Sequence, residues 1–220
     1  MSKKYKAILF DYDGTLVDTN QLIVDSWNHM YMAYCGGELT KEDVVWTFGI
    51  PLRDGIDGVM KIKGHSGYDL DELTAAYRSY QADLGPDAMA PFPGVCGVLK
   101  ELKARGAKLG IVTSRQEKSC MEGLKWYGLC DLFDRIVTAE TTPVHKPGPE
   151  PALLCLRGLG VDPADAIMVG DSVFDLQCGN NAGCDSCFVA WSFATSAVKA
   201  VAEGSPTMIV DSPEQFLDLI

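Results

Sequence analysis

Two acidic side chains stand two residues apart where a short apolar segment ends. Residues 7–10 are followed by Asp11 and Asp13, and Gly14 allows the chain to turn directly after them. Two carboxylates in one small space repel each other and resist the loss of water unless they share a cation or a proton. The spacing therefore predicts a site that binds a cation.

More carboxylates follow a later apolar segment. Asp171 comes after residues 166–170, and Asp175 lies about one helical turn further on. Three or four carboxylates in one crevice suit a hard divalent cation with oxygen ligands, most simply Mg²⁺, and no His or Cys cluster accompanies them, which disfavours zinc. Cys184 and Cys187 have the spacing of half a zinc site, but no second pair completes it. We interpret them as buried, reduced, small apolar residues.

Two hydroxyls and one lysine offer a place for phosphate oxygens. Thr113 and Ser114 follow the apolar residues 109–112, and Lys146 lies in a loop stiffened by prolines. A hydroxyl, the N–H groups of a turn and one ammonium are the donors that a phosphoryl group needs. For Lys146 alone, a second interpretation stays open, that of a solvated surface lysine.

The segments before these polar residues predict the strands of one parallel sheet. Continuous apolar runs are typical of strands that are covered on both faces, and helical spacing separates them. This alternation predicts an α/β fold with a Rossmann-like parallel-sheet core, in which ligands bind at the carboxyl ends of the strands. The predicted strands are residues 6–10, 108–112, 135–138 and 166–169, with weaker candidates at 186–190 and 207–210.

Residues 20–84 show helical periodicity and no convincing strand. Apolar residues recur at helical spacing near both ends of this segment, and glycine and proline follow it at residues 85–94. We predict an all-helical cap domain over residues 19–85, inserted into an α/β core made of residues 1–18 and 86–220.

Four motifs in order resemble those of the haloacid dehalogenase (HAD) superfamily. Residues 10–18 read F-D-Y-D-G-T-L-V-D and resemble its D-x-D-G-T-L-x-D motif, with Tyr12 where an aliphatic residue is more usual. The segments at 111–114, 146–147 and 169–175 look like the second, third and fourth motifs. The insertion after the first motif is similar to the branch that contains phosphoglycolate phosphatase, a pyrophosphatase and β-phosphoglucomutase.

The resemblance implies a mechanism and a role for each residue. Asp11 would attack phosphorus and form an aspartyl-phosphate, and Asp13 would protonate the leaving oxygen and then activate water. Lys146 and Thr113 would bind the oxygens of the transferred group, and Gly14 and Ser114 complete the predicted phosphate-binding set. The implied Mg²⁺ ligands are Asp11, Asp13 through its backbone carbonyl, Asp171, and Asp175 close by.

The cap segment 47–53 resembles the part that faces the active site in the phosphatase and pyrophosphatase members. Two interpretations of Arg53 stay open, a contact to a substrate carboxylate or second phosphate, and a solvated arginine in the first turn of a helix.

Three functions are consistent with these residues. The first is a Mg²⁺-dependent phosphatase acting on a small phosphorylated metabolite, either a phosphoglycolate-like phosphoester or pyrophosphate. The second is a phosphomutase similar to β-phosphoglucomutase, which the missing lysine of the cap segment 48–53 disfavours. The third, a non-catalytic module that binds a phosphorylated ligand, ranks last because Asp11, Asp13, Lys146 and Asp171 are all present.

The balance of charged residues restricts the classes of molecule that the protein can bind. The 220 residues include 19 lysines and arginines against 30 aspartates and glutamates, a net charge of −11. Such a charge repels nucleic acid and anionic membranes at long range, while a small phosphorylated ligand remains compatible because local cations overrule the global field. The basic start is followed by only four apolar residues, too few for a signal peptide or a membrane span. We expect a cytoplasmic protein that is a monomer or homodimer.

Overall fold

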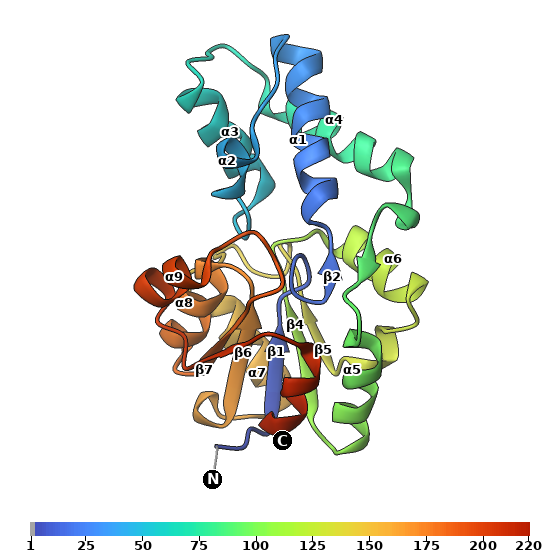
Figure 1. Cartoon of the computed structure of the whole chain (residues 1–220), viewed down its shortest axis with the longest axis vertical. Helices are drawn as coiled ribbons and strands as arrows, with labels where there is room; N and C mark the ends of the chain where they lie inside the picture. Colours follow the sequence, from blue (N-terminus) through green and yellow to red (C-terminus); the bar gives the residue numbers. More distant parts are fainter. Residues whose placement is uncertain (1–2) are drawn as a thin grey trace.

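One parallel sheet forms the centre of the molecule. The computed structural model describes residues 3–220. Six strands lie in the order β5-β4-β1-β6-β7-β8, and every neighbouring pair is parallel (Figure 1). These strands are β1 Ala7–Phe10, β4 Lys108–Val112, β5 Arg135–Val137, β6 Ala166–Gly170, β7 Asp185–Val189 and β8 Met208–Val210.

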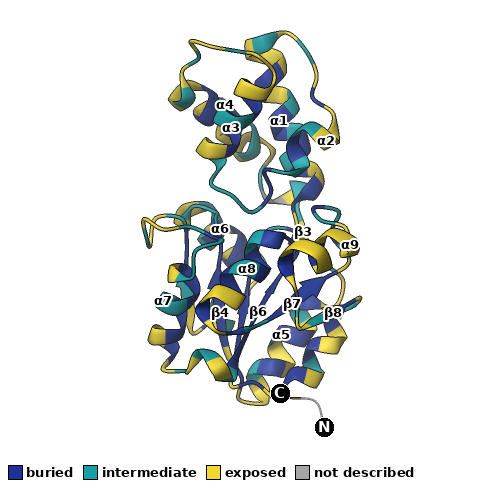
Figure 2. Ribbon diagram, turned by 90° about the vertical axis from the view of Figure 1, so that its left-hand side faces the viewer, coloured by how far each residue is buried: buried dark blue, intermediate teal, exposed yellow. Residues whose placement is uncertain are grey.

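Helices cover both faces of this sheet. Along β1 the side chains alternate, with Ile8 and Phe10 in one apolar cluster and Ala7 and Leu9 in another, and all four are fully buried. The first cluster includes α5 and α6, and the second includes α7 and α8. Figure 2 shows the buried strands between helices whose outer faces are exposed. The helices are α5 Val95–Ala104, α6 Glu117–Trp126, α7 Glu150–Leu159 and α8 Val173–Ala182, followed by a short α9, Ala197–Lys199. The predicted α/β parallel-sheet fold is confirmed.

Four further helices stand above the carboxyl ends of the strands (Figure 1). They pack around an apolar cluster of their own, which contains Trp27 and Ile56, both almost fully buried. Where the chain enters and leaves this helical part, Val17 pairs with Pro91 in a two-stranded antiparallel ribbon. These elements are α1 Asn20–Cys35, α2 Lys41–Val45, α3 Leu52–Ile62 and α4 Leu70–Leu84, with the ribbon strands β2 Val17–Asp18 and β3 Ala90–Pro91.

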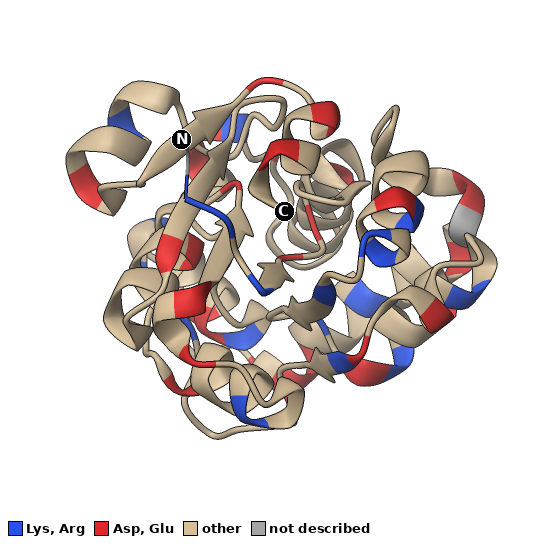
Figure 3. Cartoon of the chain, turned by 90° about the horizontal axis from the view of Figure 1, so that it is seen from below, with Lys and Arg blue, Asp and Glu red and all other residues tan. Residues whose placement is uncertain are grey.

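The surface carries mixed charge. Seen from the end that holds both termini, acidic and basic residues are interspersed (Figure 3). Within residues 3–220, none of the helices has the length and apolar character needed to cross a membrane.

Candidate active site

Three carboxylates meet at the carboxyl ends of adjacent strands. Asp11 directly follows β1 and Asp171 directly follows β6, the strand hydrogen-bonded to β1. Asp175 lies in the first turn of α8, which begins after Ser172. One carboxylate oxygen from each of the three acids lies within 4.8 Å of the others, and all three residues are buried. The sheet register thus brings together acids that are 160 residues apart in the chain.

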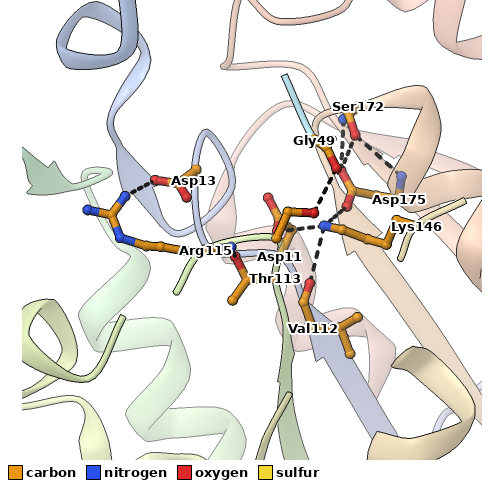
Figure 4. Close-up of polar contacts among 10 residues, drawn as sticks. Asp11, Asp13, Gly49, Val112, Thr113, Arg115, Lys146, Ser172 and Asp175 are labelled. Atoms are coloured by element: carbon orange, nitrogen blue, oxygen red, sulfur yellow. Dashed lines mark hydrogen bonds and ion pairs between the residues drawn. The ribbon is translucent and has the colours of Figure 1, made fainter. Parts of the chain in front are cut away.

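Lys146 is the cation of this cluster. Its ammonium nitrogen lies 2.8 Å from Asp11 Oδ1 and 2.5 Å from Asp175 Oδ1, and donates to the Val112 carbonyl at 3.3 Å (Figure 4). Only 2% of the lysine side chain is exposed. The interpretation of Lys146 as a solvated surface lysine is therefore wrong, because the loop carries it into the interior beside the carboxylates.

Burial controls the protonation of these groups. Burial raises the pKa of Asp11 to about 7, with Lys146 acting in the opposite direction and Asp175 adding to the rise. Burial, then the charges of Asp175 and Asp11, hold the pKa of Asp171 well above its usual range. Burial opposes the charge of Lys146, but attraction by Asp11 and Asp175 outweighs it and raises its pKa. One ammonium cannot balance three carboxylates, so this donor set fits a hard divalent cation with oxygen ligands.

Neighbouring groups fix how two of these acids point. Ser172 donates through its hydroxyl to Asp175 Oδ2 at 2.5 Å, and the Asp175 N–H donates back, which starts α8 as a capping box and leaves Oδ1 for Lys146. Ser192 donates to Asp171 Oδ2 at 2.5 Å. Gly14 packs against the same carboxylate, since a Cβ there would overlap Asp171 Oδ2. The backbone φ of Gly14, +73°, also favours glycine, so this position permits the close approach.

Asp13 points away from the three-carboxylate cluster. Its carboxylate forms an ion pair with Arg115, at 2.6 Å between Oδ1 and Nη1 (Figure 4). Its side chain therefore does not join the cluster, and its backbone carbonyl as a metal ligand stays a prediction. Arg115 is not among the predicted site residues, although it directly follows Thr113 and Ser114 after β4, a position that could have indicated it.

The helical part closes one side of the site. Ser114 donates through its hydroxyl to the Gly49 carbonyl at 2.8 Å, so this hydroxyl contacts the helical part, and Thr113 Oγ1 accepts from the Arg115 N–H. Between the two parts lies a cleft of about 960 Å³, lined by Asp11, Asp13, Thr113 and Asp171 from below and by residues of the helical part, including Phe48, from above. Arg53 also lines this cleft, half exposed and ion-paired with Asp71. The structure does not bring it to the carboxylate cluster, and its contact with substrate stays a prediction.

The comparison with known families agrees with this geometry. The model of the haloacid dehalogenase-like hydrolase family matches residues 8–189, which include the three acids and Lys146. The chain belongs to this family. The HAD membership that the four motifs predicted is confirmed, and with it the hydrolase class.

Relatives of this HAD hydrolase share almost its full length. The pyrophosphatase PpaX of Bacillus velezensis is 37% identical over 216 residues, which cover 98% of this chain and 93% of that protein. PpaX of Halalkalibacterium halodurans is 33% identical over 214 residues, covering 97% and 96%. These matches bear out the prediction of a phosphatase within the hydrolase family.

Solved structures show the same fold. A β-phosphoglucomutase from Clostridium difficile superposes with a TM-score of 0.81 at 22% identity, over 96% of this chain and 92% of its own. A protein from Haemophilus somnus, described as a predicted phosphoglycolate phosphatase, superposes with a TM-score of 0.87 at 23% identity, over 100% and 99%. At these identities the likeness establishes the fold alone.

Proposed function

We propose that this HAD phosphatase is a Mg²⁺-dependent, cytoplasmic enzyme that hydrolyses pyrophosphate or a small phosphoester such as phosphoglycolate. The observation that supports this proposal is the buried contact of Lys146 with Asp11 beside Asp171 and Asp175. A nucleophilic carboxylate and an ammonium that binds phosphate oxygens must lie this close to act on one phosphorus atom. The names of the PpaX relatives favour pyrophosphate. We expect a monomer or homodimer.

The three acids would hold the metal ion. Asp11, Asp171 and Asp175 offer the oxygen ligands that Mg²⁺ prefers, and Asp13 would add its backbone carbonyl. When bound, Mg²⁺ supplies positive charge that allows a carboxylate and a phosphate to approach each other.

The residues of the chain would perform the reaction in two steps. Asp11 attacks phosphorus in line, while the Lys146 ammonium and the Thr113 hydroxyl bind the non-bridging oxygens. The bond from phosphorus to the leaving oxygen breaks, and Asp13 gives that oxygen a proton. Asp13 then takes a proton from water, which attacks the aspartyl-phosphate and releases phosphate and free Asp11.

The helical insertion would exclude water during the first step. We propose residues 19–85 as a cap domain, whose Gly49 segment already contacts Ser114 and lies against Ser172. A closed cap excludes bulk water and selects the substrate by its shape. The mutase function is not proposed, because the likeness to β-phosphoglucomutase extends to the fold only.

Phosphate release tests this function. Purified protein is assayed with pyrophosphate, phosphoglycolate, sugar phosphates and nucleotides, with Mg²⁺ and again with EDTA. We expect release from pyrophosphate or phosphoglycolate that requires Mg²⁺. The Asp11→Asn variant should be inactive with an unchanged circular dichroism spectrum, while Asp165→Asn, an exposed acid paired with Lys6 before β6, should stay active. Activity in EDTA would contradict the metal, and activity of the Asp11→Asn variant would contradict the nucleophile.

A further inference from the structure

Arg115 is a buried cation that the proposed mechanism does not use. It follows Thr113 and Ser114 after β4, and only 10% of its side chain is exposed. It nevertheless lines the cleft together with Asp13 and Asp11. The guanidinium thus lies at the reacting end of the cleft, out of bulk water.

The donors of Arg115 are incompletely used. Nη1 is paired with Asp13 at 2.6 Å, and the only other hydrogen-bond acceptor of the Arg115 side chain among the described residues is the sulfur of Met89, 3.9 Å from Nη2. Its Nε is buried and has no hydrogen-bond partner within residues 3–220. A guanidinium has five N–H donors, and a buried donor without a partner destabilises the structure. Arg115 therefore has donors free for a second anion beside Asp13.

The position of Asp13 identifies where that anion would come from. On the proposed function, on which this inference rests, Asp13 protonates the leaving oxygen, so the leaving group lies next to Asp13. The guanidinium paired with Asp13 must then also lie next to the leaving group. If that group is charged, its oxygens can take the forked, charge-assisted hydrogen bonds that arginine offers.

We propose that Arg115 makes the enzyme specific for substrates whose leaving group is an anion. The carboxylate or phosphate of the leaving group binds the guanidinium and replaces Asp13 there. Asp13, released from its ion pair, is free to turn toward the leaving oxygen. A neutral leaving group offers no replacement, and Asp13 then stays with Arg115.

Two substrates that differ in one carboxylate test the exchange. Phosphoglycolate and ethyl phosphate are compared by kcat and KM for the wild type, Arg115→Met, Arg115→Lys and Lys118→Met. Lys118 is the matched control, because it lines the same cleft and is exposed without an ion pair to any residue that the structure describes. Circular dichroism and thermal melting show whether each variant folds. Arg115→Lys keeps the positive charge at the same site if the methionine variant does not fold.

We expect the wild type to prefer phosphoglycolate. The Arg115→Met variant should reduce the ratio of kcat/KM for phosphoglycolate to kcat/KM for ethyl phosphate by about 10- to 100-fold, which is the contribution of one charge-assisted hydrogen bond. Its kcat on phosphoglycolate should fall as well as its KM rise, since the exchange also releases Asp13. Arg115→Lys should keep only part of the preference, because lysine keeps the positive charge but lacks the paired N–H donors of the guanidinium. Lys118→Met should keep all of the preference.

Any other outcome of this comparison contradicts a specific statement of the proposal. Equal loss on both substrates in the arginine variants would make Arg115 merely structural and overturn the inference. A change in KM alone would overturn the exchange with Asp13. An active wild type whose preference survives in Arg115→Met overturns this inference and leaves the proposed function intact. A wild type that hydrolyses neither of these compounds nor pyrophosphate overturns both.

Discussion

Replacing Lys146 with methionine removes the only positive side chain that contacts Asp11 and Asp175 in the described structure, and nearly preserves its length. The ammonium lies 2.8 Å and 2.5 Å from these two acids, and 2% of the lysine side chain is exposed. Removing one partner of a buried ion pair leaves an uncompensated buried charge, which costs about 3–5 kcal/mol. We expect the free energy of unfolding of the Lys146→Met variant to fall by about this amount at pH 8 without Mg²⁺.

The loss should grow with pH. In the wild type the pKa of Asp11 is raised to about 7, chiefly by burial and despite the opposing charge of Lys146. Without that charge, folded Asp11 keeps its proton to higher pH, while the unfolded chain has released it. Where the folded state holds one proton more than the unfolded chain, the free energy of unfolding falls by about 1.4 kcal/mol for each unit by which the pH rises. The difference from the wild type is therefore constant below pH 7 and widens above it.

Urea unfolding at pH 6 and at pH 8.5, with EDTA and with Mg²⁺, measures these effects. Added Mg²⁺ should restore part of the stability of Lys146→Met, because it supplies positive charge to the same carboxylates. Lys103→Met is the control, since Lys103 and its partner Asp134 are each about one-third exposed. It should lose less than about 1 kcal/mol at both pH values. An equal loss for Lys146→Met at pH 6 and pH 8.5, unaffected by Mg²⁺, would refute the electrostatic reasoning.

Three further changes probe the same site. Mg²⁺ should bind more weakly at pH 6 than at pH 8, because the pKa of about 7 for buried Asp11 means that a proton must leave before the cation binds; equal affinities by calorimetry would contradict this. Gly14→Ala should lower Mg²⁺ affinity at least about ten-fold, because its Cβ would overlap Asp171 and its φ of +73° is strained for alanine; calorimetry that shows unchanged affinity would be the contrary result. Gly49→Ala places a Cβ 2.7 Å from Ser172 Oγ at a φ of +92°. It should raise KM several-fold and keep the free energy of unfolding within about 1 kcal/mol of the wild-type value. A wild-type KM would show that the cap does not need the close approach of Gly49 to Ser172.

The features that could be predicted from the sequence are those encoded in short segments. Continuous apolar runs indicated the strands, because a strand buried on both faces has no polar residue to alternate. Once the strands were placed, the carboxyl-end rule put Asp11 and Asp171 at one edge, where the structure has them. The capping box that starts α8 joins Ser172 and Asp175, three residues apart, so it too is encoded in one short segment.

Contacts between distant segments were not predictable in this way. The order β5-β4-β1-β6-β7-β8 depends on which apolar faces pack together, and several orders satisfy the same pattern. The ribbon of β2 and β3 joins residues 17 and 91, and the bond from Ser192 to Asp171 joins a loop after β7 to the end of β6. Each depends on the complete three-dimensional arrangement rather than on local spacing.

Contacts with distant segments explain why a tyrosine stands at position 12. It is fully buried, and its hydroxyl has no hydrogen-bond partner within residues 3–220. The ring fits because α6 carries Gly123, where any Cβ would overlap that hydroxyl. The Arg115 guanidinium carbon lies 5.3 Å from the ring centroid, within the range of a cation–π contact. An aliphatic residue at position 12 would lack this contact, so the tyrosine and the glycine together support the arginine that holds Asp13.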